Sequence, residues 1–500
     1  MKKKIYFEFL YLIILGALTS LSLPPYNFLF INFLTFSLFF IFVFHKKKTS
    51  NNKSFFYGWF FGFGYFLTNL YWISISLTFD QNLKFLIPFS LFLIPAFLAI
   101  FYGLIAYFFI IFKTKKIISS FFVFSLIFGI FEFLRGSILT GFPWNLIAYS
   151  FSNQLEIISV ISITGTYGFN LLCASLFTSP AVFILREKRK DIVISIFFII
   201  SLIFFYMFGS FYQQKFNNIN EELYDYKIRV IGSNISLDRF YKDIDTVSVI
   251  NELIKVSNPD KNEKTIFIWP EGILPDINQR ELKEYKWLFE KYFSERHLLI
   301  MGINNKIIDE NNFTNYYNSL SVYDNELNLL GFYDKINLVP FGEFLPLKNV
   351  LNKVGLRSIT NNNQSFSKGD RRDLIEIRQE NLFIKILPLI CYEIIYSGKL
   401  FENSDFDFIV NISEDGWFGQ SIGPKQHLAH SIFRAIESGK YLLRSANNGQ
   451  SVIVNPLGII EQKVSYGKSG YIDLFQVKKI QPTVFSKFGN KIFGLLILLY

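Results

Sequence analysis

Three side chains of this 500-residue chain could together carry out acyl chemistry: Glu271 in IWPEG, Lys335 in YDKINLVPFGE and Cys391 in LPLICYE. A cysteine thiol, with an ordinary pKa of about 8.5, needs a nearby base or cation to act as a nucleophile. Glu271 could take the thiol proton, and Lys335 could stabilise both the thiolate and the oxyanion of a tetrahedral intermediate. The backbone N–H after Cys391 could donate to the same oxyanion. This chemistry requires no histidine.

Each of these residues also has a plain structural interpretation. A glutamate in a turn is usually solvated, a lysine usually lies on the surface, and a free cysteine is usually a small buried hydrophobe. Their joint placement favours the catalytic interpretation, because all three lie at the ends of predicted strands. Ligand crevices in α/β domains form at strand ends.

The elements that would position these residues lie between about residues 215 and 480. Five apolar runs there read as buried strands: 227–232, 265–270, 297–302, 381–390 and 406–412. Residues 279–296 and 426–440 have the apolar spacing of intervening helices. Strands that alternate with helices predict a layered α/β domain.

The first part of the chain is far more apolar. The whole chain is 51% hydrophobic and 18% charged, which disfavours both a disordered chain and an ordinary soluble enzyme. We therefore expect a multi-pass α-helical membrane domain at 1–213, a globular domain at 214–483 and a C-terminal transmembrane helix at 484–500. The runs long enough to cross a bilayer lie near 6–22, 27–44, 55–78, 85–112, 117–135, 157–185 and 192–212, and a shorter run covers 485–500.

Charge predicts the orientation of these spans. Residues 1–214 hold 16 Lys/Arg and 6 Asp/Glu, and the remainder of the chain is neutral. If every run crosses, most of the 16 fall on one side, in clusters at 2–4, 46–53, 113–116 and 186–190. Basic loops stay cytoplasmic, so we expect a cytoplasmic N-terminus and an extracytoplasmic globular domain. Short basic clusters between apolar runs are typical of membrane topology and not of nucleic-acid binding.

Longer motifs surround the candidate triad and occur in the membrane half. They are YW at 71–72, GFPWN at 141–145, GTYGFN at 165–170, LVPFGEFLP at 338–346 and NISEDGWFG at 411–419. With Glu, Lys and Cys in this order, the chain resembles the bacterial apolipoprotein N-acyltransferases over essentially its full length. These form a membrane-embedded branch of the nitrilase superfamily of carbon–nitrogen hydrolases. The resemblance implies that the globular part is an extracytoplasmic α/β nitrilase-like αββα sandwich.

The resemblance also implies a reaction. A fatty acyl chain would pass from a membrane phospholipid, through a thioester on Cys391, to the α-amino group of an apolipoprotein's diacylglyceryl-cysteine. Glu343 would be a second essential carboxylate, and Tyr392 and Glu393 would flank the nucleophile in the active site. The residues that would contact substrate or line the cleft are Tyr241, Phe341, Ser413, Trp417, Phe418 and Trp144.

The expected setting follows from the same resemblance. It implies a monomeric enzyme in the bacterial inner (cytoplasmic) membrane, with its catalytic domain in the periplasm. The partners would be a phospholipid, an apolipoprotein and the bilayer itself, with no nucleic acid, metal or cofactor.

The sequence departs from the family pattern at three places. The family usually has a His two residues after the catalytic Lys, where this chain has Asn337. The later motif has Glu414 and Asp415 in place of Asn-Asp. The early motif, which usually carries a Gln and a later Trp, reads GSNISLDRFY at 232–241, with Tyr241 at the Trp position. None of these departures falls on the triad.

Other sites in the sequence were weighed against this interpretation. GQSIG at 419–423 fits the G-x-S-x-G pattern of serine hydrolases, but that elbow needs a strand directly before Ser421. His427 and His430 could bind a metal, but no local carboxylate or thiol completes a set, and a helix face near the cleft is favoured. Glu132 and Arg135, one helical turn apart, could form an interfacial pair that shapes the lipid entrance or could be structural.

Two other functions use the same features. A membrane-anchored amidase could apply this triad to a soluble amide with water as the second nucleophile, although seven spans exceed what an anchor needs. A transporter would show charged or broken helices at mid-membrane or an internal repeat, and the sequence shows few charges in its spans and no repeat.

Overall fold

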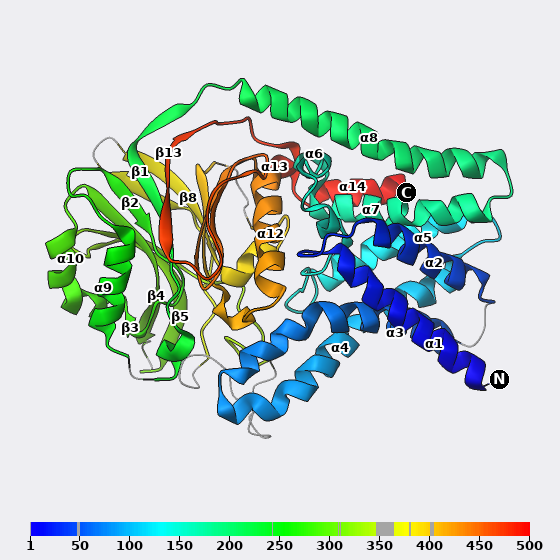
Figure 1. Cartoon of the computed structure of the whole chain (residues 1–500), viewed down its shortest axis with the longest axis horizontal. Helices are drawn as coiled ribbons and strands as arrows, with labels where there is room; N and C mark the ends of the chain where they lie inside the picture. Colours follow the sequence, from blue (N-terminus) through cyan, green and yellow to red (C-terminus); the bar gives the residue numbers. More distant parts are fainter. Residues whose placement is uncertain are drawn as a thin grey trace.

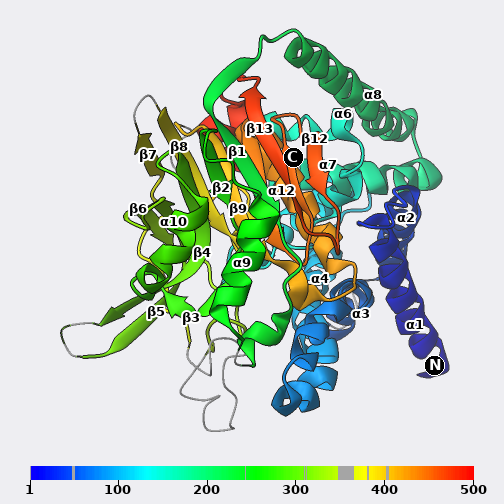
Figure 2. The ribbon, with the colours of Figure 1, turned by 60° about the vertical axis from the view of Figure 1, so that its left-hand side comes forward.

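The structure is a computed structural model that describes residues 2–47, 51–242, 244–308, 310, 312–346, 365–379, 382–400 and 405–500. A bundle of helices and a domain of two packed sheets lie end to end, and the N-terminus is at the end of the bundle far from the sheets (Figures 1 and 2). Lys48 of the second basic cluster, and residue 381 at the start of a predicted strand, lie outside the described residues.

Seven helices of 16 or more residues form the bundle within the described part of the chain, in agreement with the seven predicted runs. Five of them are long and apolar enough to cross a membrane, at Ile5–Ser22, Gln81–Phe112, Ile117–Arg135, Ile161–Leu185 and Arg189–Asn217. The bundle helices are α1 (Lys2–Thr19), α2 (Phe30–His45), α3 (Asn51–Leu70), α4 (Ile87–Phe112), α5 (Ile117–Arg135), α7 (Ile161–Leu185) and α8 (Arg189–Asn217), with the short α6 (Leu155–Ile158).

Helix α7 is broken at Gly165, which has φ +68° and ψ 172°. A Cβ atom at this position would lie 2.0 Å from the Phe485 ring, so only glycine fits both the backbone conformation and the space. The break leaves the N–H of Thr166 at a new helix start, where it donates to Glu437 Oε1 at 2.7 Å. A carboxylate at a helix N-terminus is favoured by the helix dipole, so this contact ties the bundle to the globular domain.

The last apolar run does not form the single helix that the sequence predicted. It folds as α13 (Val484–Phe488) and α14 (Lys491–Leu499), separated at Gly489, where φ is +55°. Nine residues of helix rise only about 14 Å, against a hydrocarbon thickness of about 30 Å. Helix α14 instead packs on the bundle, with the Phe493 and Phe133 rings stacked at 4.9 Å.

Two sheets form the globular domain. The first has the order β13-β1-β2-β4-β5-β6, with β3 paired to β4, and the second has the order β12-β11-β10-β9-β8-β7. All five predicted strands are confirmed, as β1, β2, β4, β8 and β9. The first sheet contains β1 (Glu222–Gly232), β2 (Thr265–Ile268), β3 (Leu274–Asn278), β4 (His297–Ile308), β5 (Thr314–Asp324), β6 (Leu329–Asp334) and β13 (Gly470–Val477). The second contains β7 (Ile375–Gln379), β8 (Leu382–Ile390), β9 (Phe408–Glu414), β10 (Tyr441–Asn447), β11 (Ser451–Val454) and β12 (Ile460–Val464).

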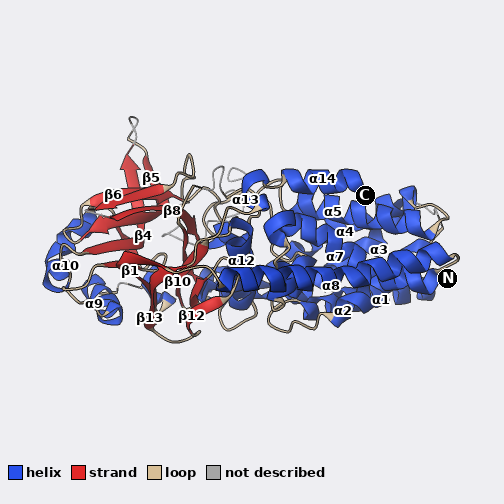
Figure 3. Ribbon diagram, turned by 90° about the horizontal axis from the view of Figure 1, so that it is seen from above, coloured by secondary structure: helices blue, strands red, loops and turns tan. Residues whose placement is uncertain are grey.

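Side chains alternate between the two faces of each sheet, as the two-residue period of a strand requires. Val230 packs between the sheets and its neighbour Ile231 packs outward, under α9 (Thr246–Ser257) and α10 (Lys286–Tyr292). Val410 likewise faces inward and Ile409 outward, toward α12 (Gly423–Ser438). The result is the expected αββα sandwich, whose layers are seen edge-on in Figure 3.

One predicted helix is mostly wrong. Residues 279–296 form a 3-10 turn, η6 (Glu281–Tyr285), and only then the seven-residue α10. The reason is local: β3 runs to Asn278, whose Oδ1 accepts from the N–H groups of Arg280 and Glu281 and so makes a tight turn. The helix predicted at 426–440 is confirmed as α12.

Helix α12 lies between the second sheet and the bundle (Figure 1). A single continuous apolar core joins outward-facing residues of β8, β9 and β10, residues of α12 and the interior of the bundle. The two parts of the molecule therefore share one apolar core.

Candidate active site

Cys391 lies where β8 ends and a 3-10 turn, η8 (Cys391–Ile395), begins. Its φ of +49° is in the left-handed region, which costs a non-glycine residue conformational energy. Glu393 helps to hold the turn, because its Oε2 accepts from the Ile390 N–H at 3.0 Å. The first N–H groups of a helical turn have no partner within the turn, so the N–H of Tyr392 is suited to an oxyanion beside the thiol.

Glu271 follows β2 and meets Lys335, which follows β6. Lys335 Nζ lies 3.4 Å from Glu271 Oε1 and 2.9 Å from Glu343 Oε1. Asn318, in β5, donates through Nδ2 to the same two oxygens at 2.7 and 2.8 Å. All four side chains are buried. One ammonium and one amide therefore hold two carboxylates in fixed positions.

The second oxygen of each carboxylate is held by the backbone. Glu271 Oε2 accepts from the N–H of Glu414 at 2.9 Å, and Glu343 Oε2 accepts from the N–H of Val339 at 2.8 Å. Neither carboxylate can rotate without losing a hydrogen bond in a buried place, where an unmade bond is costly. The predicted base is thus fixed from two sides.

The charges of the site follow from burial and neighbours. Burial disfavours the Lys335 ammonium, but the Glu343 and Glu271 carboxylates outweigh it and raise the pKa of Lys335 above its ordinary value. Burial raises the pKa of Cys391, Glu271 raises it further, and Lys335 acts in the opposite direction. These shifts favour a Lys335 ammonium and a protonated Cys391 thiol in the resting site.

Glu393 connects the two catalytic segments. Its Oε1 accepts from the Tyr333 hydroxyl at 2.7 Å, from the N–H groups of the two residues that follow Lys335, at 3.1 Å each, and from Arg372. Its other oxygen holds the turn at Cys391. One fully buried carboxylate thus ties the lysine loop to the nucleophile turn, which is a positioning role.

A second buried cluster supports the nucleophile from the other side. Asp415 Oδ1 accepts from Ser413 Oγ at 2.8 Å and from Arg444 Nη2 at 2.7 Å, and it lies 3.0 Å from His427 Nδ1. Burial opposes ionisation of Asp415, but Arg444 and His427 prevail and lower its pKa below the ordinary value. His427 Nε2 lies 3.2 Å from the carbonyl oxygen of Cys391, so the cluster contacts the nucleophile's own backbone.

The structure brings Glu343 and Glu393 next to the three predicted catalytic residues. The side chain of Tyr392 instead extends toward the helix bundle. The Tyr392 hydroxyl donates to the Gly141 carbonyl at 3.0 Å, in the loop after α5, and its ring stacks on that of Phe142. The supporting role of Tyr392 in the active site stays a prediction, and its side chain lies against the loop after α5. The residue after the nucleophile anchors the turn to the membrane domain.

The expected substrate-contact residues fall into separate groups. Trp144 and Phe418 lie at the contact between the domains, where the indole N–H of Trp144 donates to an α12 side chain at 2.8 Å. Tyr241 and Trp417 form another aromatic pair, with ring centroids 6.4 Å apart. Phe341 is 48% exposed, with φ +65°. Substrate contact by these residues stays a prediction.

Sequence reasoning did not single out Asn318 and Arg444. Both lie in strands, within NYYNSLSVYD and YLLRSAN, and both are buried. A polar or charged side chain within an apolar strand indicates a buried polar cluster, because such a side chain is costly to bury without a partner.

The rival motifs do not form sites. Ser421 follows a 3-10 turn and not a strand, and its Oγ donates to the Phe418 carbonyl at 2.7 Å, so the serine-hydrolase interpretation is wrong. His427 and His430 lie on the buried side of α12, as favoured, and His430 Nδ1 is 2.8 Å from the Tyr149 hydroxyl. Among the described residues, no group of three or more His, Cys, Asp or Glu side chains could hold a metal ion.

Glu132 and Arg135, in the helix bundle, have a structural role. Glu132 and Arg135 form a buried ion pair, and Arg135 donates to the carbonyl of Phe142 and, at 3.4 Å, to that of Asn145. The pair therefore fixes the loop on which Tyr392 rests.

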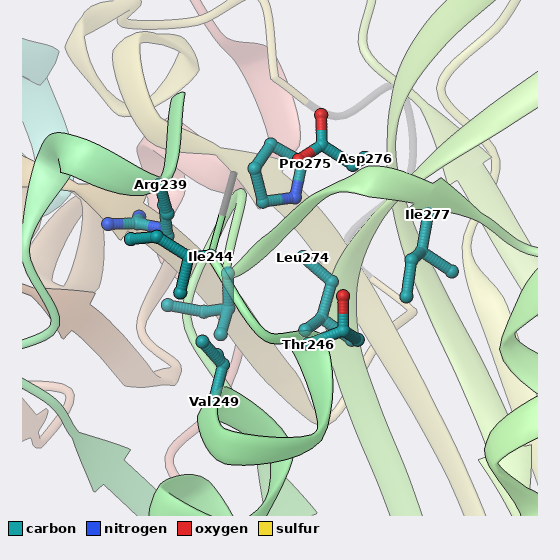
Figure 4. Close-up of a pocket in the computed structure, with 9 residues that line it drawn as sticks. Arg239, Ile244, Thr246, Val249, Leu274, Pro275, Asp276 and Ile277 are labelled. Atoms are coloured by element: carbon teal, nitrogen blue, oxygen red, sulfur yellow. The ribbon is translucent and has the colours of Figure 1, made fainter. Parts of the chain in front are cut away.

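A small hollow lies beside β3, and no triad residue lines it (Figure 4). It has space for about one water molecule, so it cannot hold an acyl chain. Its lining residues are Arg239, Ile244, Thr246, Val249, Ile273, Leu274, Pro275, Asp276 and Ile277.

A buried cysteine at a strand end beside a glutamate–lysine pair, in an αββα sandwich, defines a carbon–nitrogen hydrolase domain. Residues 268–474 match the carbon–nitrogen hydrolase family, and residues 15–179 match the apolipoprotein N-acyltransferase N-terminal domain. The chain belongs to the apolipoprotein N-acyltransferase family, and it is an acyltransferase of the nitrilase superfamily.

Individual relatives cover nearly the whole chain. The apolipoprotein N-acyltransferase of Rickettsia prowazekii is 33% identical and covers 96% of this chain and 94% of its own. That of Rhodopseudomonas palustris is 30% identical and covers 95% of this chain and 90% of its own. A solved carbon–nitrogen hydrolase from Helicobacter pylori is 15% identical, covers 50% of this chain and 88% of its own, and has a TM-score of 0.35.

Proposed function

We propose that this chain transfers a fatty acyl group from a membrane phospholipid to the α-amino group of an apolipoprotein's diacylglyceryl-cysteine, through a thioester on Cys391. The observation that carries the proposal is the attachment of the nucleophile turn to the membrane domain. The hydroxyl of Tyr392 donates to Gly141, and that of Tyr396 donates to the Thr140 carbonyl at 2.8 Å. A thiol held at that place is suited to an ester in a lipid.

The first step forms the acyl-enzyme. Cys391 Sγ attacks the ester carbonyl while its proton passes to Glu271, and the carbonyl oxygen becomes an oxyanion. The Lys335 ammonium and the N–H of Tyr392 stabilise this charge. Collapse of the intermediate breaks the ester C–O bond, and the leaving alkoxide takes the proton from Glu271. The products are a thioester and a lysophospholipid.

The second step uses the same groups in the same order. The α-amine of the apolipoprotein attacks the thioester carbonyl and passes one proton to Glu271. The oxyanion again lies against Lys335. The C–S bond then breaks, the thiolate regains the proton from Glu271, and the product is an amide. Base and cation return to their starting states, so no cofactor is needed for turnover.

The bilayer placement of this machinery is part of the proposal. We take 1–213 as the membrane domain and 214–483 as the catalytic domain, in the periplasm, with α13 and α14 returning the chain to the bundle. Lys113 Nζ donates to the carbonyls of Val43 and Phe44, so the ends of α2 and α4 that carry basic residues meet. Basic residues gathered at one end support a cytoplasmic location for that end, in the inner membrane of a bacterium.

Mass measurement tests the proposal directly. The purified full chain is incubated with a phospholipid in mixed micelles, and Cys391 is examined by intact mass and peptide mapping. We expect a hydroxylamine-labile fatty-acyl adduct on Cys391 in the wild type and in Cys173→Ala, the matched cysteine control, but none in Cys391→Ala. Addition of a diacylglyceryl-cysteine peptide should discharge the adduct and acylate the peptide amine.

Two results would contradict the proposal. An unmodified Cys391 in folded wild-type protein would exclude a phospholipid donor. Release of free fatty acid without acylation of the peptide would show that water is the acceptor, and it would favour the amidase alternative.

A further inference from the structure

Two segments that depart from the family pattern, 232–241 and 411–418, meet in a buried ion pair between Arg239 and Glu414. We propose that Arg239 and Glu414 are positioning residues. Together they hold Glu271 in place as the base for both acyl-transfer steps. This inference rests on the proposed function for the role of Glu271, and its geometry is independent of the substrate.

Arg239 joins two parts of the site. It lies in the 3-10 turn η5 (Leu237–Phe240) and is only 2% exposed. Its Nη2 donates to Glu414 Oε2, and its Nε donates at 3.0 Å to the carbonyl of Gly272, the residue after the base. Its Nη1 donates to the Ser236 carbonyl at 2.8 Å and so fixes the guanidinium to its own turn.

Glu414 connects Arg239 to the side chain of Glu271. It is the last residue of β9, and its N–H is the donor that holds Glu271 Oε2 at 2.9 Å. Its carboxylate accepts from Asn447 Nδ2 at 2.6 Å and from the Gly416 N–H at 2.8 Å, in addition to Arg239. Burial raises the pKa of the Glu414 carboxyl, and Arg239 opposes that shift, so the cation helps to keep this anchor ionised.

The hydrogen bonds of the pair constrain both the backbone and the side chain of Glu271. Arg239 holds the backbone just after the base and, through Glu414, holds the donor to the base's side chain. The hydrogen bonds of the pair reach the triad at Glu271 and not at the thiol or Lys335, which gives the pair a positioning role. A base displaced by a fraction of an ångström transfers protons less well, and misplacement by 1 Å can cost about 10²-fold in rate.

A second arginine–carboxylate pair, in the first sheet, serves as the control. Arg229 donates through Nε and Nη2 to Asp473 Oδ1 and Oδ2 at 2.7 and 2.8 Å, joining β1 to β13. Arg229 is buried like Arg239, but neither partner contacts a triad residue. A purely structural role for the Arg239–Glu414 pair would lower stability without lowering the rate per folded molecule, as expected for the control pair.

The test compares double neutral variants, because removal of one partner alone leaves a buried charge unpaired. Arg239→Gln/Glu414→Gln and Arg229→Gln/Asp473→Asn are purified as full chains and assayed for acyl-enzyme formation on Cys391 against phospholipid concentration. We expect the first variant to lose about 10- to 100-fold in the maximal rate per folded molecule, with an unchanged KM. The control should keep the wild-type rate. Arg239→Lys, which keeps the charge opposite Glu414, should recover part of the loss.

Three outcomes would overturn the proposal: a wild-type maximal rate in the Arg239/Glu414 variant, an equal loss in the control variant, or a change confined to KM. If the wild type itself forms no acyl-enzyme, the proposed function fails and the pair is tested on the thiol alone. Alkylation of Cys391 by iodoacetamide also needs a base to remove its proton. It should then slow in the Arg239/Glu414 variant and not in the control, and equal rates would refute the pair's role.

Discussion

Replacement of Lys335 by methionine tests the centre of the mechanism. At an effective dielectric constant of about 20, the contacts at 2.9 and 3.4 Å correspond to attractions of about 5 to 6 kcal/mol each, which burial offsets in part. Loss of the cation leaves Glu271 and Glu343 bonded to one Asn318 amide. Two carboxylates so close cannot both stay ionised, so one takes up a proton.

The expected effect on rate has two sources. Loss of an oxyanion donor costs about 10²–10³-fold, and partial protonation of the base slows the reaction further. Lys335→Met should therefore form the Cys391 thioester at least about 10²-fold more slowly than the wild type. The assay is the rise of acyl-enzyme mass with time after phospholipid is added.

The control for this variant lies on β8, the strand that leads to Cys391. Lys385, in β8, pairs with Asp405 at 2.6 Å near the surface, and Lys385→Met should leave the rate unchanged. A Lys335→Met protein with native stability that accumulates acyl-enzyme at the wild-type rate would refute the assigned role. Slow acylation in a protein that has lost its thermal transition would instead report unfolding, so both properties are measured on each sample.

Three further predictions use other parts of the structure. A Cβ at Gly302 would lie 2.6 Å from the Cα of Glu271, so Gly302→Ala should slow acyl-enzyme formation. Gly494 has open space around it, so Gly494→Ala should not slow it. Equal rates of acyl-enzyme formation in the two variants, measured by mass spectrometry, would contradict this prediction. Because burial and Glu271 raise the pKa of Cys391, its alkylation should keep accelerating above about pH 9, and a rate that is flat from about pH 6 would reveal a preformed thiolate. A reporter fused after residue 215 should be active only outside the cytoplasm, and cytoplasmic activity would reverse the proposed topology.

The sequence predicted the sandwich well because its strands are short, buried on both faces and therefore nearly continuous in apolar residues. It predicted the helix at 279–296 poorly, because periodic apolar residues such as Leu282 and Phe289 pack in the core from a turn and a short helix as well as from one long helix. The break at Gly489 was missed for a similar reason. Hydropathy does not report a left-handed residue inside an apolar run.

Some residues of the site could be predicted from the sequence and others could not. Glu271, Lys335 and Cys391 could be found because their chemistry is specific and each lies at a strand end. The direction of the Tyr392 side chain could not, because it depends on a loop some 250 residues earlier in the chain. The partnership of Arg239 with Glu414 was equally hidden, since each was visible only as part of an unexplained departure from a motif.

The contacts of η8 and α12 join the globular domain to the helix bundle. On α12, Arg434 donates to the hydroxyl of Thr166, at the start of the second half of α7, and to the Ile395 carbonyl at 3.2 Å. Glu437 accepts from Thr166 and from Ser397, just beyond the nucleophile turn, at 2.6 Å each. Arg434 and Glu437 pair with each other on α12, and separation of the domains would break the hydrogen bonds of both side chains to Thr166. If donor and acceptor exchange at one thiol, as proposed, we expect α12, η8 and the second half of α7 to stay together during the exchange.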